Sequence, residues 1–169
     1  MVISIVGVVL TAIGVLLVYL QLRKNHKWNR RQAAHDLLFG PYMFEFYPQY
    51  EHIRSKVDMF DSNKDYTDYE DELSEEDKLK IDQTLNFLEN VCISMRDNIV
   101  DEEVVYKSVG SLLPNYQRFM NPYIKEQRSE VSSLLWVYLD DYAERWRKRA
   151  EKRKKSSLDG RREEGRDKL

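Results

Sequence analysis

Cysteine, proline and glycine are all scarce in this 169-residue chain, with 1, 4 and 6 copies respectively. The single cysteine, Cys92, excludes an internal disulfide and a zinc site built from cysteines, and it fits a reducing compartment. So few glycines and prolines argue against an all-β fold, which needs many tight turns. The net charge of −2 creates no overall field that would attract nucleic acid, so nucleic acid is not an expected partner.

Residue patterns that carry catalysis or bind metals are also missing. His26, His35 and His52 lack the paired spacing of a metal site such as His-x-x-x-His. The chain has no glycine-rich phosphate loop, nucleophile elbow or Cys/His nucleophile signature. The sequence therefore predicts no metal, no cofactor and no catalytic residue, and it favours a protein that is not an enzyme.

One long apolar run is present, from Val2 to Leu22, and no charged side chain interrupts it. As a helix it would be about 30 Å long, which matches the hydrocarbon core of a bilayer. A cleaved signal peptide is the alternative, but no basic segment precedes the run and no small-residue cleavage site follows it. A buried core helix is usually shorter or amphipathic. We therefore expect an uncleaved transmembrane anchor over residues 1–22.

Basic residues crowd the C-terminal flank of this run, and none precedes it: Arg23, Lys24, Lys27, Arg30 and Arg31. Because positive flanks stay in the cytoplasm, the expected location is the inner (plasma) membrane, crossed once, with the N terminus outside. Small residues share one face of the run: Ser4, Gly7, Thr11 and Gly14. Such a face favours self-association in lipid, although small residues are also common in membrane helices that do not associate.

The rest of the chain predicts an all-α fold in the cytoplasm. A juxtamembrane helix over residues 23–40 would end at Gly40 and Pro41. Residues 41–149 predict a bundle of about four helices, with a long C-terminal helix. Its first segment, Tyr42 to Tyr50, is rich in aromatic residues, and packing on the bundle is favoured over a ligand pocket or a second membrane contact. A short helix is then expected from Gln49 to Phe60.

Residues 61–77 form an acidic segment with almost no apolar residues, which predicts a solvated, mobile connector. A calcium loop is disfavoured because the central glycine is missing. Ser74 and Asp77 then have the spacing of a capping box, which begins a helix. That helix has an apolar seam at alternating spacings of four and three residues: Ile81, Leu85, Leu88, Cys92, Met95 and Ile99.

Two more helices are expected after a break at residues 98–101. The first begins at Asp101, and Pro114 should kink it or divide it into two pieces. The second is expected from Pro122 to Lys155, because Asn121 and Pro122 suit the start of a helix. Its apolar stripe is interrupted by Arg128, which would need a partner such as Glu89, unless it extends to water along its methylene stem.

The C-terminal segment is basic, and residues 150–169 predict a disordered tail. A group of basic residues is the candidate for binding anionic lipid or an acidic partner: Arg147, Lys148, Arg149, Lys152, Arg153, Lys154 and Lys155. The acidic connector and RNA are other possible partners, and a tail that serves only solubility is the alternative to all of them.

Two short segments, Leu85–Val91 (Leu-Asn-Phe-Leu-Glu-Asn-Val) and Ile99–Val105 (Ile-Val-Asp-Glu-Glu-Val-Val), resemble the bacterial family called Domain of Unknown Function 4760. An aromatic-Leu-Glu turn and an Ile-x-Asp-Glu helix start are typical of that family, and a later arginine would correspond to Arg128. The resemblance implies a small bacterial protein with an N-terminal membrane helix and a helical cytosolic part. It implies no reaction. A role in phage defence is only an analogy with other small membrane-anchored proteins.

Taken together, these patterns predict a non-enzymatic, membrane-tethered helical module for protein interaction or ligand sensing, which self-associates. Its expected partners are the lipid bilayer, a second copy of the chain and an unknown cytosolic protein or ligand. A membrane effector of a bacterial defence or toxin system is the first alternative. An enzyme that uses Glu89 and Arg128 is the second.

Overall fold

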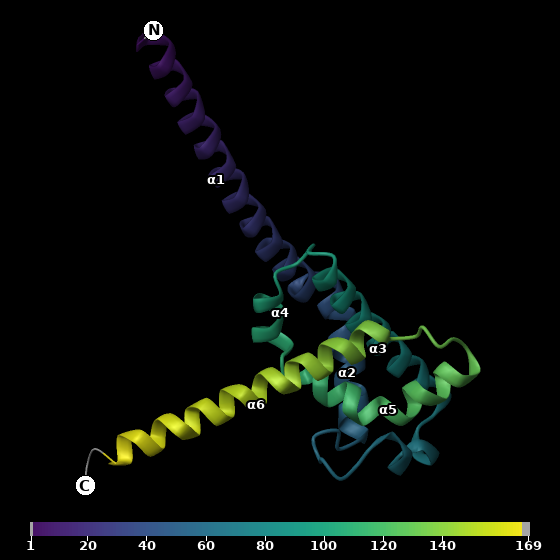
Figure 1. The fold of residues 1–169 in the computed structure, drawn as a ribbon. Coiled ribbons are helices and arrows are strands. Elements are labelled where there is room, and N and C mark those ends of the chain that lie inside the picture. The colour runs from purple at the N-terminus through teal and green to yellow at the C-terminus, as the bar shows by residue number, and fades with distance from the viewer. Residues whose placement is uncertain (1, 167–169) are drawn as a thin grey trace.

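Helices make up all the regular secondary structure of the described residues in a computed structural model of the chain (Figure 1). The structure describes the backbone of residues 2–166 and the side chains of residues 11–40, 44 and 46–156. The α-helices are α1 (Val2–Phe39), α2 (Pro41–Lys56), α3 (Glu75–Arg96), α4 (Glu102–Val109), α5 (Leu112–Glu130) and α6 (Val137–Arg166), and two short 3₁₀ helices are η1 (Tyr66–Asp68) and η2 (Glu70–Glu72). The predicted all-α fold is confirmed.

The central helix of the packed body is α3, which contacts α2 on one side and α6 on another. Helix α5 packs against α6 and η1, and the last turns of α1 pack against α2 and α4. Apolar side chains from every α-helix fill the interior, and α1 and α6 leave this body in different directions (Figure 1). The body therefore has one core, with two long helices that project from it.

Helix α1 continues without a break for 38 residues. It ends where predicted, because Pro41 begins α2 and the chain bends at Gly40. The Gly40 N–H donates to the carbonyl of Asp36 at 2.9 Å. A Cβ at position 40 would lie 2.3 Å from that carbonyl oxygen, so the close approach requires glycine.

The aromatic segment is part of α2, which begins and ends earlier than the helix expected over residues 49–60. Phe46 and Tyr50 are buried, and the Phe46 ring stacks on Phe87 of α3 with centroids 4.2 Å apart. Phe44 and Tyr47 are instead 80% and 46% exposed. Packing on the bundle is therefore confirmed for the buried rings, and the side chains of residues 42 and 43 lie outside the described residues.

The acidic connector packs against the body, which corrects the expectation of a solvated segment. Tyr66 and Leu73 are only 1% and 7% exposed. The guanidinium of Arg118 on α5 donates to four carbonyl oxygens, those of Met59, Asp61, Ser62 and Lys64, at 2.8, 2.8, 3.4 and 2.9 Å. The sequence did not indicate this contact, because backbone carbonyls leave no signal in composition.

Helix α3 begins with the predicted capping box, in which Ser74 and Asp77 bond to each other's backbone N–H. The apolar seam faces the core at every predicted position within the helix. Ile99 is the exception at 57% exposed, because α3 ends at Arg96 and the helical spacing stops there. Asp101 then caps α4, since its carboxylate accepts from the N–H groups of Glu103 and Val104.

The last helix does not begin at Pro122, and this prediction is wrong. Pro122 lies inside α5, which has buried side chains on both sides of it, such as Phe119 and Ile124. Tertiary packing therefore maintains the helix through the proline, despite the lost N–H. The predicted division near Pro114 occurs just before it, between Val109 and Leu112.

The chain turns between α5 and α6, and the predicted stripe is interrupted there. Val131 is 69% exposed, while Tyr142 and Trp146 are buried farther along α6. Helix α6 then extends to Arg166, through the segment for which the sequence predicts a disordered tail.

Candidate functional site

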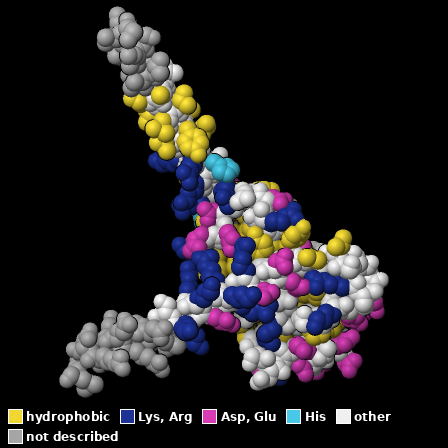
Figure 2. Space-filling model, in the orientation of Figure 1, with side chains coloured by type: hydrophobic (Ala, Val, Ile, Leu, Met, Phe, Trp, Pro, Cys, Tyr) yellow, Lys and Arg dark blue, Asp and Glu magenta, His cyan; other side chains and the backbone are white. Residues whose placement is uncertain are grey.

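The first described side chains of α1 form an apolar surface around the whole helix. Residues from Val15 to Leu20 follow one another, and each is between 50% and 65% exposed. Consecutive positions point in different directions around a helix, so no face of this stretch is buried against the body. Figure 2 shows this apolar surface, followed immediately by a band of lysine and arginine side chains. Such a large exposed apolar surface needs an apolar environment.

Two residues of the predicted small-residue face, Thr11 and Gly14, are described and exposed. A Cβ added at Gly14 would meet no atom within 4 Å, so the protein itself does not require glycine there. Ser4 and Gly7 lie outside the residues whose side chains are described. Over the part of the chain that could be searched, no helix is both long enough and apolar enough to cross a membrane.

The basic end of α1 is attached to the turn between α3 and α4. The Asp101 N–H donates to the Arg30 carbonyl at 3.1 Å, and the Arg30 guanidinium donates to the Val100 carbonyl at 3.0 Å. Arg31 Nε lies 3.5 Å from the Asp101 carboxylate, and Ala34 is fully buried one turn farther on. These contacts fix the direction of α1 relative to the body. The sequence had assigned Arg30 and Arg31 only to the membrane flank.

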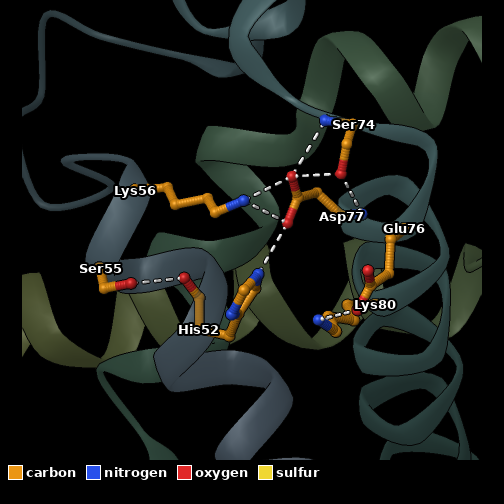
Figure 3. A network of polar contacts seen from close by, with 7 residues as sticks. All are labelled: His52, Ser55, Lys56, Ser74, Glu76, Asp77 and Lys80. Carbon is orange, nitrogen blue, oxygen red and sulfur yellow. Dashed lines mark hydrogen bonds and ion pairs between the residues drawn. The ribbon is translucent and has the colours of Figure 1, made fainter.

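A second polar group joins the end of α2 to the start of α3, and Asp77 is its centre (Figure 3). Lys56 Nζ donates to both Asp77 carboxylate oxygens at 2.8 and 2.7 Å, and His52 Nε2 lies 2.8 Å from Oδ1. Ser74 adds its N–H and its hydroxyl at 2.9 and 2.7 Å. The carboxylate is 1% exposed, whereas Lys56 and His52 are 40% and 38% exposed.

Burial alone would raise the pKa of Asp77, but hydrogen bonds from Lys56, Ser74 and His52 outweigh it and hold that pKa well below its ordinary value. Asp77 therefore remains charged in the folded protein at neutral pH. The sequence identified its capping role but not the two side chains from α2, Lys56 and His52. With every carboxylate lone pair directed at a donor, this group serves structure rather than substrate binding.

Glu89 and Arg128, the predicted ion pair, have separate partners among the described residues. Glu89 accepts the backbone N–H groups of Tyr138 and Leu139 at 3.2 and 2.7 Å, so it satisfies the first turn of α6. Arg128 instead donates to the Asp140 carboxylate at 2.6 Å and to the Leu135 carbonyl at 2.7 Å. The correction has a simple cause: the chain turns between residues 128 and 140, which brings Asp140 to Arg128.

The two side chains still affect each other through charge. Burial raises the pKa of Glu89, while the two backbone hydrogen bonds and the positive charge of Arg128 act against that increase. Asp140 also accepts from Gln117, which in turn accepts from Arg147. These residues form a polar network between α5 and α6. Their partners are all backbone or side-chain groups of the same body, which favours a structural role over the proposed catalytic one.

The predicted basic group on α6 divides into two sets. Arg147 and Arg149 turn back to the body, where they bind Gln117 and Glu103, and Arg149 also lies over the Tyr106 ring. Lys152 and Lys155 are exposed. Three others are also exposed and have contacts with other residues: Lys148 with Glu144, Arg153 with Glu103, and Lys154. Helix α6 ends far from the N-terminal end of α1 (Figure 1).

The single cysteine, Cys92, lies in the core. Burial raises the pKa of the Cys92 thiol, which is fully buried in the α3 seam, so a reactive thiolate does not form. Across the described residues, no three His, Cys, Asp or Glu side chains are placed to hold a metal ion.

A family model described as Domain of unknown function (DUF4760) matches residues 6–146. The match covers most of the chain, from within the apolar run to Trp146 in α6. The described residues of this matched part form a small all-helical domain. The chain belongs to this family. No curated protein and no solved structure matches it significantly.

Proposed function

We propose that the protein is a single-pass, membrane-tethered helical module that binds a protein or ligand in the cytoplasm, without catalysis. The observation that carries this proposal is the apolar surface of α1, exposed from Val15 to Leu20 and followed directly by basic residues. A bilayer removes such a surface from water, and basic residues favour the cytoplasmic side. The family match supports the proposal because it begins at residue 6, inside the apolar run.

The junction at Arg30 and Asp101 supports a role beyond simple attachment. Because α1 is continuous and bonded to the α3–α4 turn, a movement of the body would tilt or rotate the anchor as one unit. A partner that binds the body could therefore change the arrangement of neighbouring anchors. This geometry suits a sensor or an interaction module more than an enzyme, for which the described residues offer no reactive group.

Extraction of membranes with alkaline carbonate tests the tethering. The full-length protein should remain in the membrane pellet, together with a known single-pass protein, because about 30 Å of apolar helix resists removal from lipid. Release into the supernatant would contradict the proposal.

Self-association through α1 is expected to weaken when Gly14 is replaced by leucine. The larger side chain would separate two helices that pack through Thr11 and Gly14, while the open space around Gly14 leaves each copy intact. We expect about tenfold weaker association of the full-length protein, measured by light scattering in detergent. Ala12→Leu, on the opposite side of the helix, is the matched control and should have no effect. An equal effect of both substitutions would contradict packing through the small-residue face.

A further inference from the structure

An acidic cleft of about 420 Å³ lies where η1 and η2, the start of α3 and the end of α5 meet. Its lining has one lysine and several carboxylates: Lys78, Glu70, Glu75, Asp82, Glu126 and Glu130. Lys78 is already bound to Glu75 at 3.1 Å. The other carboxylates are not neutralised by a cation of the cleft, so the cleft has a strongly negative potential. Figure 2 shows acidic side chains gathered at this end of the body.

A tyrosine with a buried side chain also lines the cleft. Tyr66 lines the cleft and is only 1% exposed, yet its hydroxyl forms no hydrogen bond with any side chain or backbone group that the structure describes. The charges that act on this hydroxyl are those of Lys78, Glu70, Glu126 and Glu75, all of which line the cleft. The hydroxyl therefore faces the cleft. The hydroxyl is therefore available to bond a group that enters the cleft.

Asp82 supplies a further reason for a cation at this place. Its carboxylate is half-buried and accepts a hydrogen bond from the Tyr123 hydroxyl at 2.8 Å. Burial raises the pKa of Asp82, and the Tyr123 hydrogen bond offsets only part of that increase. A positive charge in the cleft would stabilise the ionised carboxylate, since opposite charges at short range favour the charged form.

Helix α6 of the same chain has exposed lysines, which carry the positive charge that the acidic cleft would bind. Lys152 and Lys155 are one turn apart on one helix face, and both are exposed and form no ion pair with other described residues. Helix α6 leaves the body and ends well away from the connector between α2 and α3, whose 3₁₀ helices line the cleft (Figure 1). These lysines therefore cannot reach the cleft of their own molecule, but they can reach the cleft of a neighbour.

We propose that the acidic cleft of one copy binds the Lys152–Lys155 face of α6 from a second copy, with Tyr66 and Asp82 as hydrogen-bonding partners of the incoming ammonium groups. The proposal rests on the proposed self-association and names a second contact for it outside the anchor. Two different surfaces are joined, so the interface is head-to-tail: of two joined copies, one keeps a free α6 and the other a free cleft for further neighbours. Copies whose anchors lie parallel in one bilayer would assemble into a ring or a row.

Carbodiimide cross-linking of the full-length protein in liposomes tests this contact, because the reagent joins only a lysine and a carboxylate that touch. Two preparations are mixed, one of natural isotope composition and one labelled with ¹⁵N. We expect mixed-isotope peptides that join Lys152 or Lys155 to Glu126 or Glu130. Cross-links between these residues with a single isotope composition throughout would show a contact within one molecule and would overturn the proposal.

Charge reversal provides the matched variants. Lys152→Glu with Lys155→Glu, and separately Glu126→Lys with Glu130→Lys, should each weaken association of the full-length protein about tenfold, because like charges then face each other. This association is measured by light scattering, since neither variant alone has a lysine opposite a carboxylate to cross-link. A mixture of the two variants should restore the association and give mixed-isotope cross-links, since opposite charges face each other again in both contacts. Lys107→Glu, an exposed lysine on α4, is the control and should change nothing.

The outcomes distinguish association through the cleft from association through α1. If charge reversal changes nothing while Gly14→Leu reduces association, the cleft contact is excluded and association through α1 remains. If the full-length protein is monomeric under every condition, self-association itself is excluded, and both fail. Association that decreases with each variant but is not restored in the mixture would also contradict the cleft contact.

Discussion

Replacement of Leu16 and Leu17 by arginine is expected to move most of the protein from the membrane fraction to the soluble fraction. An arginine at the centre of a membrane helix costs about 2.5–3.5 kcal/mol, and positions 16 and 17 lie between that centre and the basic flank, so two arginines there offset part of the stabilisation that the apolar run provides. Both leucines are more than half exposed, at 56% and 60%, so the body should fold normally. Fractionation of cells and circular dichroism of the released protein measure the two effects.

Leu134→Arg is the control for this experiment. Leu134 is 79% exposed and apolar, but it lies in the turn between α5 and α6, outside the anchor. We expect the Leu134→Arg protein to stay in the membrane fraction. If the α1 variant also stays there, the apolar surface of α1 is not what holds the protein on the membrane.

Asp77→Asn is expected to reduce the free energy of unfolding by about 3 kcal/mol, because it leaves donors around a buried site without their charge partner. This loss of unfolding free energy is at the low end of what breaking a buried charged pair costs, since Lys56 and His52 are partly exposed and can be hydrated. Glu76→Gln is the matched control, because Glu76 is the exposed neighbour of Asp77 and pairs with Lys80 on the same helix (Figure 3). That control should change stability by less than about 0.5 kcal/mol.

The dependence on pH provides a second measurement of the same group. The pKa of Asp77 is lower in the folded than in the unfolded protein, so its contribution is complete above the unfolded pKa of about 4. It is lost as the pH falls below that value toward the folded pKa. Denaturant titrations should therefore show a large difference between the two proteins at pH 7 that becomes smaller below pH 4. A difference independent of pH would indicate that packing, rather than charge, is lost.

Elements with strong local signals could be predicted from the sequence. The end of α1 depends on Gly40 and Pro41, and the start of α3 depends on Ser74 and Asp77, all of which act within a few residues. The start of the last helix was misplaced because the same local reasoning was applied to Pro122. Buried side chains on both sides of that proline maintain α5, and such packing is a property of the whole fold.

Contacts between distant segments could not be predicted. Glu89 and Arg128 were recognised as charges that need partners, but the turn before α6 gives them Leu139 and Asp140 instead of each other. The sequence predicts that Tyr66 lies in a solvated connector, whereas the structure buries it. No local sequence pattern shows that Arg118 binds the backbone carbonyls at the start of this connector. In each case the partner is a backbone group or a residue brought near by a turn that the sequence did not locate.

The most direct test of a membrane-tethered body is the accessibility of a cysteine placed on α6. Ser156 is exposed on α6, whereas the native Cys92 is fully buried and should not react. With Ser156→Cys, we predict no labelling by a membrane-impermeant maleimide in intact cells and full labelling in inverted membrane vesicles. Labelling of intact cells, or recovery of the labelled protein away from membranes, would contradict the account.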